Sequence, residues 1–205
     1  MTTEIEVFAD IWCPFAHVGL RCARDRRDAT GRDDVIIRVR PWPLELVNSA
    51  PMDPARTASH VEHLRHQVDD SLFAGFDASN FPTSTLEALA LIEHAYRSDA
   101  RIGEMATFAV RDALFEQGLD ISDPAVLSAI AAELGIGPVD DTDRAAVTES
   151  WHAGQIRGVK GSPHFFSGDA EVFCPSLDIA RSDSGEVSIA LNIERLDAFL
   201  DRCLG

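Results

Sequence analysis

Strand-like segments occur in two groups, at opposite ends of this 205-residue chain, and about 100 residues with only helical patterns separate them. Near the N-terminus, residues 4–9 form a short apolar run, and residues 34–42 alternate between apolar and polar side chains. Residues 14–29 between them are typical of a helix that ends at Gly31. The chain is therefore expected to begin with a strand, a helix and a second strand.

The other group of strands follows Gly161. Residues 163–174 predict a hairpin that turns at residues 168–169, and residues 180–191 predict a second, shorter hairpin. A closing helix is expected over residues 192–204. The C-terminal part thus adds strands and one helix to the N-terminal strands.

The middle of the chain, residues 51–157, predicts an all-helical insertion. Its apolar residues recur at intervals of three and four, as a helical bundle requires. Ser84 or Thr83 is expected to cap the second of its helices, with Glu87 placed for a capping box. Five helices are expected, over residues 53–76, 84–99, 102–118, 123–135 and 140–158.

The fold class that follows is α/β. Residues 1–50 and 158–205 would form one domain, and residues 51–157 would be an all-helical domain inserted into it. Residues 44–54 read as a turn-rich connector at the start of the insertion.

The charge of the chain excludes two classes of partner. Thirty-four acidic residues against 18 basic residues give a net charge of −16, which repels nucleic acid and anionic membrane surfaces. The N-terminal residues lack the pattern of a signal peptide, and no apolar run is long enough for a membrane helix. We therefore expect a cytoplasmic protein that binds neither nucleic acid nor membranes.

Cys13 is the strongest candidate for a catalytic residue. The first strand runs straight into Trp12-Cys13-Pro14, and proline is well tolerated in the first turn of a helix. The unpaired N–H groups and the dipole of that helix would favour the thiolate and lower the pKa of Cys13. A dithiol enzyme would carry its second cysteine three residues later, where this chain has Ala16.

Three neighbours of Cys13 are secondary candidates. His17 lies one helical turn further on the same face, where it would stabilise the thiolate or relay a proton, or simply fill a packing gap. Trp12 and Phe15 flank the thiol and would form either an apolar lip for a substrate or part of the core.

No metal site is expected. His60, His63 and His66 are spaced three apart, so they drift around their helix and are best interpreted as a solvated face. Cys22 is interpreted as a packing residue, and Cys203 is given no role.

These features together resemble the DsbA family of the thioredoxin superfamily, especially its cytosolic branch. The resemblance is carried by Cys13-Pro14 at a helix start, by the helical insertion and by "GVKGSPHFF" before a hairpin. Two further stretches match, "VRPWPL" and "LFEQGLDISDPAVLSAIAAELGI".

The resemblance implies a thioredoxin-like fold with an inserted helical domain. It also implies a cis Pro163 beside the thiol, and backbone there that binds an extended peptide or a thiol cofactor. The site residues that it carries over are Cys13, Pro14, Ser162 and Pro163.

Ala16 departs from the dithiol members of this family. A related branch, the 2-hydroxychromene-2-carboxylate isomerases and kappa-class glutathione transferases, has Ser-Pro at the first position and no resolving thiol. The leading interpretation is a thiol-disulfide oxidoreductase that works through the single thiolate of Cys13, by a mixed disulfide with a small thiol or a substrate. The alternatives are a thiol-cofactor-dependent isomerase or transferase, and a binding module without catalysis.

The expected partners follow from this resemblance. No tightly bound cofactor is expected, and the partner would be a small thiol of the glutathione or mycothiol type together with a protein or small-molecule substrate. The sequence leaves open whether the chain forms a homodimer.

Cys174 is the last candidate. If the hairpin turns through Ser167 to Ala170, then outward counting pairs Pro163 with Cys174 and brings Cys174 close to the Cys13 site. Strands two apart are separated by about 10 Å, beyond the reach of a disulfide, so a direct bond to Cys13 would require loop movement.

Overall fold

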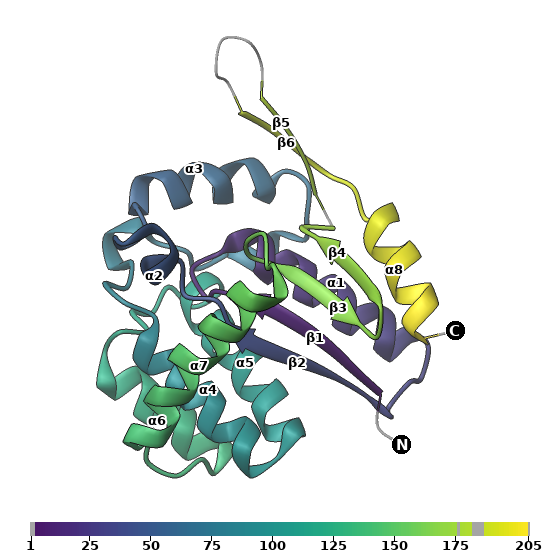
Figure 1. Cartoon of the computed structure of the whole chain (residues 1–205). Coiled ribbons are helices and arrows are strands. Elements are labelled where there is room, and N and C mark those ends of the chain that lie inside the picture. The colour runs from purple at the N-terminus through teal and green to yellow at the C-terminus, as the bar shows by residue number, and fades with distance from the viewer. Residues whose placement is uncertain (1–2, 176, 182–186, 205) are drawn as a thin grey trace.

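The structure is a computed structural model, and it describes residues 3–175, 177–181 and 187–204. Strands and helices follow one another as Figure 1 shows. The strands are β1 (Thr3–Ala9), β2 (Val35–Pro41), β3 (His164–Ser167), β4 (Ala170–Phe173), β5 (Leu177–Arg181) and β6 (Val187–Leu191). The helices are α1 (Pro14–Ala29), α2 (Leu44–Asn48), α3 (Pro54–Arg65), α4 (Leu86–Ser98), α5 (Ala100–Phe115), α6 (Pro124–Leu134), α7 (Asp141–Arg157) and α8 (Glu194–Leu204), with short 3₁₀ turns η1 (Asp70–Phe73) and η2 (Ala78–Asn80).

Four strands form the central sheet, in the order β2-β1-β3-β4. β1 is parallel to β2 and antiparallel to β3, and β3 and β4 form a hairpin. The hairpin pairs Ser167 with Ala170 and His164 with Phe173, which confirms the register predicted for it. β5 and β6 form a separate two-stranded sheet, and the turn expected between them lies outside the described residues.

The two faces of the central sheet are covered by different helices (Figure 1). One face presents alternate residues of β1, such as Ile5 and Val7, to α1 and α8, and Phe199 and Leu200 complete that core. The opposite face packs Phe8, Trp42 and Phe166 against α7. Gly154 of α7 lies against the Trp42 ring so closely that a Cβ atom there would be 2.6 Å from it. The sheet is thus buried on both faces.

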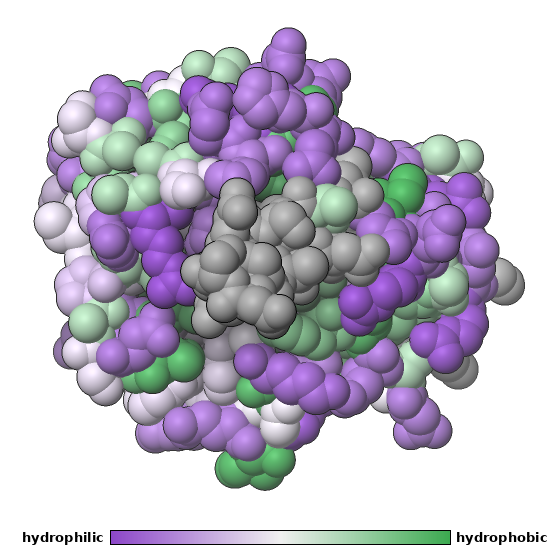
Figure 2. Space-filling view, turned by 90° about the horizontal axis from the view of Figure 1, so that it is seen from above, coloured by the Kyte–Doolittle hydropathy of each residue, from purple (hydrophilic) through white to green (hydrophobic). Residues whose placement is uncertain are grey.

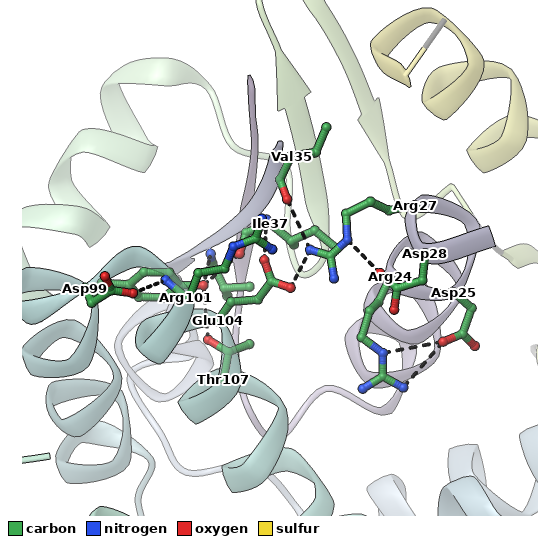
Figure 3. A network of polar contacts seen from close by, with 12 residues as sticks. Arg24, Asp25, Arg27, Asp28, Val35, Ile37, Asp99, Arg101, Glu104 and Thr107 are labelled. Carbon is green, nitrogen blue, oxygen red and sulfur yellow. Dashed lines mark hydrogen bonds and ion pairs between the residues drawn. The ribbon is translucent and has the colours of Figure 1, made fainter. Parts of the chain in front are cut away.

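The helical insertion is joined to the sheet along the free edge of β2. Glu104 of α5 accepts a hydrogen bond from the Ile37 N–H at 2.8 Å, and its other oxygen pairs with the buried guanidinium of Arg27 from α1 (Figure 3). Tyr96 of α4 donates to the Ile37 carbonyl at 2.7 Å and accepts from the Val39 N–H at 3.0 Å. These side chains satisfy backbone groups that an edge strand would otherwise leave unpaired.

The first expected helix of the insertion, over residues 53–76, was wrong in length. α3 ends at Arg65, and a turn with η1 and η2 follows. Asp69 and Asp77 each accept a hydrogen bond from a backbone N–H two residues later, which starts a new turn instead of continuing the helix. Arg65 fixes this loop by donating to the Phe73 carbonyl at 2.7 Å.

Two local predictions near the start of the insertion are also corrected. The connector after β2 contains the short helix α2, which ends at Ser49 in a left-handed conformation with φ 54°. The capping box of α4 does not form with Glu87. Glu45 of α2 instead accepts from the Thr85 N–H at 2.9 Å and from the Ser84 hydroxyl at 3.0 Å. A carboxylate distant in sequence therefore replaces the local one.

The surface agrees with the high net charge. The face seen in Figure 2 is mostly hydrophilic, and its hydrophobic residues form separate small patches. Among the described residues, no helix combines the length and apolar character that crossing a membrane requires.

The edge contact of Glu104 generates a stability prediction. Replacing Glu104 with alanine removes the buried carboxylate that pairs with the Arg27 guanidinium and leaves the Ile37 N–H without its acceptor, and loss of one member of a buried ion pair costs about 3–5 kcal/mol. Urea unfolding of Glu104→Ala should show a loss of this size. The matched control is Glu133→Ala, at an exposed position of α6. Equal stability of the two variants would contradict the assigned role of Glu104.

Candidate functional site

Cys13 lies where β1 passes into α1, at the N-cap of the helix, with Pro14 in the first turn. Its thiol donates a hydrogen bond to the Ser162 carbonyl, with 3.1 Å between sulfur and oxygen. The Ser162 hydroxyl accepts from the Asp10 N–H at 2.9 Å. The Ser162–Pro163 peptide bond is cis. The loop before β3 is therefore held directly against the end of β1.

A cavity of about 290 Å³ opens beside this junction. It brings together five of the residues singled out from the sequence, since Cys13, Pro14, Phe15, Ser162 and Cys174 all line it. The rest of the cavity wall is formed by α2, α3, the segment between them and β4. Its residues are Leu44, Asn48, Met52, Arg56, His60 and Phe173. Both apolar and polar groups therefore face a ligand in this cavity.

Cys174 follows the last residue of β4. Its N–H donates to the Pro163 carbonyl at 2.8 Å, as the predicted register requires. The residue is buried, and its φ of 42° lies in the left-handed region that side chains other than glycine rarely adopt. All four cysteines of the chain are free thiols in this structure.

The expected low pKa of Cys13 was wrong for this structure. Burial raises the pKa of the Cys13 thiol above its ordinary value, and the negative charge of Asp10 adds to the rise. The effects foreseen from the helix N-terminus do exist, because hydrogen bonding to Ser162 and to the Ala16 and Phe15 backbone lowers the pKa. Burial outweighs them, since a charge in an apolar setting loses its hydration. Cys13 thus rests as a protonated thiol.

Asp10 and Arg111 are buried charged residues that sequence reasoning missed. Asp10 is fully buried and accepts hydrogen bonds from the Leu44 and Trp12 N–H groups, and burial raises its pKa to about 6. Arg111 of α5, also fully buried, donates to the Asp10 carbonyl at 3.3 Å, and burial lowers its pKa to about 10. Arg111 had a sequence signal, because it lies three residues after Phe108 and four before Phe115 on the apolar face of its helix.

Trp12 does not line the cavity. Its side chain is fully buried in the core of the insertion, where its ring stacks on Phe81 with the centroids 6.0 Å apart. Of the two roles considered for Trp12, the structure shows the packing role. Phe15 on the other side of the thiol does face the cavity, and its ring lies 5.0 Å from the His60 ring.

His17 is also directed away from the cavity wall. Its Nε2 donates to the Leu72 carbonyl at 3.0 Å, and its ring stacks on Phe115 at 4.9 Å and meets the edge of Phe73. Burial lowers the pKa of His17 to about 3, so the ring is neutral at physiological pH. His17 therefore joins α1 to the insertion, and the thiolate stabilisation considered for it is absent here.

His60 was assigned to a solvated face, and this is corrected. The residue is half-buried on the cavity wall, and burial lowers its pKa from the ordinary value. Arg56, one turn earlier on α3, lines the same wall. The sequence carried no signal for either residue, because only the docking of α3 over the start of α1 brings them to the cavity of Cys13.

Among the described residues, one cluster has the composition of a metal site. It comprises His17, Asp112 and Glu116, whose ligand atoms lie within 4.8 Å of one another. The guanidinium of Arg21 already donates to both carboxylates, and His17 is bonded to Leu72. The cluster is therefore an ion-pair network between α1 and α5, in which the Arg21 guanidinium supplies the positive charge that a metal ion would otherwise bring.

The family follows from comparison with known proteins. The sequence matches the DSBA-like thioredoxin domain over residues 4–183, which is most of the chain. The chain belongs to this family. The resemblance inferred from Cys13-Pro14 and the helical insertion is thereby confirmed, together with the thioredoxin-like fold. Among curated proteins, no sequence match was found.

Solved structures of this fold include both chemistries considered above. The cytosolic disulfide reductase DsbM from Pseudomonas aeruginosa is 18% identical over 98% of each chain, with a TM-score of 0.63. Its structure with GSH matches 82% of this chain and 88% of that chain, at a TM-score of 0.60. A 2-hydroxychromene-2-carboxylate isomerase is 15% identical, over 83% of this chain and 88% of that chain, with a TM-score of 0.59. At such identities the likeness concerns the fold alone.

The effect of the Asp10 charge on the pKa of Cys13 can be tested through the pH dependence of Cys13 alkylation. Because the Asp10 carboxylate raises the pKa of Cys13, Asp10→Asn should shift the midpoint of Cys13 alkylation to lower pH. Iodoacetamide labelling across pH, read by peptide mapping, measures the midpoint, and Asp169→Asn at the exposed hairpin turn is the control. A midpoint that stays or rises in Asp10→Asn, with the fold intact by circular dichroism, would refute the coupling.

The burial of His17 predicts an acid-dependent loss of stability. Its pKa falls from the ordinary 6.5 to about 3 on folding, so between these values only the unfolded chain binds the proton. The free energy of unfolding should therefore decrease as the pH falls below 6.5, by about 3 kcal/mol at pH 4.5.

His17→Phe keeps an aromatic ring between Phe73 and Phe115 and should flatten this pH dependence relative to the unsubstituted protein. Denaturant unfolding at a series of pH values measures the slope. His66→Phe, at an exposed position, serves as the control and should keep the original slope. The same slope in His17→Phe and in the control would show that His17 does not cause the acid sensitivity.

Proposed function

We propose that this protein is an enzyme that catalyses thiol-disulfide exchange through Cys13, by way of a mixed disulfide with a small thiol or a substrate. The observation that carries the proposal is the position of the Cys13 sulfur, on a cavity wall and 3.1 Å from the Ser162 carbonyl. A disulfide that enters the cavity meets the nucleophile and the backbone of the loop before β3 at the same place.

The chemistry is an exchange of sulfur partners. Cys13 loses its proton, and the resulting thiolate attacks one sulfur of the substrate disulfide, so that the Cys13–substrate bond forms and the other sulfur leaves as a thiolate. His60 lines the same cavity, and burial lowers its pKa, so we assign it as the base that accepts this proton in the proposed reaction. A second thiol then attacks the mixed disulfide, releases a new disulfide and restores Cys13.

The raised pKa of Cys13 favours reduction or exchange over net oxidation. A strong thiol oxidant depends on a reduced form that is stabilised, and a low thiolate pKa supplies that stabilisation. Burial acts in the opposite direction on Cys13. Ala16 also leaves the first turn of α1 without a second thiol, so the mixed disulfide is not resolved from that position.

The cavity suits a small thiol that carries carboxylate or amide groups, such as a thiol of the glutathione or mycothiol type. Arg56 supplies a cation, Asn48 supplies an amide, and Met52 and Phe173 supply apolar contacts. Such a thiol would be an exchanging substrate, not a tightly bound cofactor. We further propose a cytoplasmic location, which the four free cysteines support.

The proposal is tested by exposing the reduced protein to glutathione disulfide and mapping adducts by mass spectrometry. Cys13 should form a mixed disulfide as the first product, in samples quenched early, and Cys13→Ser should form none at that cavity. Cys22→Ser, outside the cavity, should behave like the unsubstituted protein. An adduct that arises on Cys22 or Cys203 while Cys13 stays reduced would overturn the proposal.

The protonated resting state of Cys13 favours a second candidate, a thiol-dependent isomerase or transferase. In that case the cavity binds a small thiol whose own sulfur attacks the substrate, and Cys13 does not react. Calorimetric titration of reduced glutathione distinguishes the two functions. Tight binding to the unsubstituted protein, retained in Cys13→Ser and without exchange against glutathione disulfide, would favour the isomerase or transferase.

A further inference from the structure

Two cysteines, Cys13 and Cys174, line the cavity, although only Cys13 belongs to the start of α1. Cys174 lines the same wall as Cys13, whereas Cys22 and Cys203 do not contribute to this cavity. Cys13 comes from the start of α1 and Cys174 follows the end of β4, 161 positions later in the chain. The pair was therefore brought together by the fold and not by a local spacing.

Consecutive carbonyl groups hold the two cysteines. The Cys13 thiol donates to the Ser162 carbonyl at 3.1 Å, and the Cys174 N–H donates to the Pro163 carbonyl at 2.8 Å. One two-residue segment thus contacts both cysteines, which line the same cavity. A disulfide requires its Cα atoms to be about 4.4–6.8 Å apart, and this shared anchor is the geometric basis for expecting the two thiols to meet.

The backbone of Cys174 weakens the objection that strands two apart are too distant. Cys174 keeps one ladder-type bond, from its N–H to the Pro163 carbonyl, but β4 ends at Phe173 and the φ of 42° at Cys174 departs from the extended conformation. Among the described residues, the other non-glycine residue with positive φ is Ser49, which ends a helix. An unusual backbone conformation that directs a side chain into a cavity is typical of a functional position.

We propose that Cys174 is the resolving thiol for Cys13, in the role that Ala16 leaves vacant. This inference rests on the proposed exchange function. Cys13 first forms a mixed disulfide with a substrate disulfide and releases one substrate thiol. The Cys174 thiolate then attacks the Cys13 sulfur, the Cys13–Cys174 disulfide forms, and the second substrate thiol leaves. The substrate disulfide gains two electrons and the protein loses two, and two equivalents of a small thiol later reduce the protein.

The electrostatics of the cavity favour this order of attack. Burial raises the pKa of Cys174 to about 12, and the negative charge of a Cys13 thiolate contributes to the rise. A Cys13 sulfur in a mixed disulfide carries no charge, so this contribution disappears after the first step. Arg195, which donates to the neighbouring Phe173 carbonyl at 3.2 Å, lowers the pKa of Cys174. Cys174 is thus ionised more easily beside a neutral mixed disulfide than beside the Cys13 thiolate that makes the first attack.

The experiment follows the product of one turnover. The reduced full-length protein is treated with one equivalent of glutathione disulfide, quenched in acid at intervals and mapped without reduction by mass spectrometry. The unsubstituted protein should lose two hydrogens and yield a linked peptide with Cys13 and Cys174. Cys174→Ser should lose the linked peptide and stop at the Cys13–glutathione adduct, as should Cys174→Ala. Cys203→Ser is the control and should keep the linked peptide.

Two contrary results are distinguishable. A stable Cys13–glutathione adduct in the unsubstituted protein, with no linked peptide and the same lifetime as in Cys174→Ser, would overturn the resolving role and leave the exchange function standing. Absence of any Cys13 adduct in all of these proteins would overturn the exchange function and the resolving role together.

Discussion

The hydrogen bonds of Ser162 are the interaction on which the rest of the site depends. The Ser162 hydroxyl accepts from the Asp10 N–H, 152 positions away, and its carbonyl accepts from the Cys13 thiol. These contacts join the end of β1 to the loop before β3, which a long helical insertion separates in sequence. Because the two segments meet here, the thiol, the loop backbone and Cys174 share one cavity.

The contact between the end of β1 and the loop before β3 also decides whether the Cys13 thiol is protonated. A helix N-terminus favours a thiolate, and hydrogen bonds from the first turn of α1 act on Cys13 in that sense. Removal of water around the sulfur acts against it and is the larger effect. Asp10 and Arg111, both fully buried beneath the junction, set the local charge, so that the insertion influences the chemistry through a residue of α5.

Most of the fold could be predicted because its elements follow local rules. The strands of the sheet, the helix after Pro14 and the register of the hairpin at residues 167–170 were all recognisable from periodicity and turn residues. The errors lie where distant side chains compete with local signals. Glu45 caps α4 in place of Glu87, and Asp69 begins a new turn where the periodicity of α3 suggested continuation. The alternatives left open for side-chain surroundings, a lip or core role for Trp12 and a catalytic or packing role for His17, were decided by packing.

By itself, the sequence determined the order of elements, the family and the position of Cys13 at a helix start without a second thiol at Ala16. It also determined the acidic surface, because composition alone sets the net charge. Only the tertiary structure decided which face of α3 covers Cys13, that Asp10 and Arg111 are buried beneath it, and that its pKa is raised. The physical reason is that local structure depends on neighbouring residues, whereas burial and electrostatic interactions depend on groups that meet only when the chain has folded.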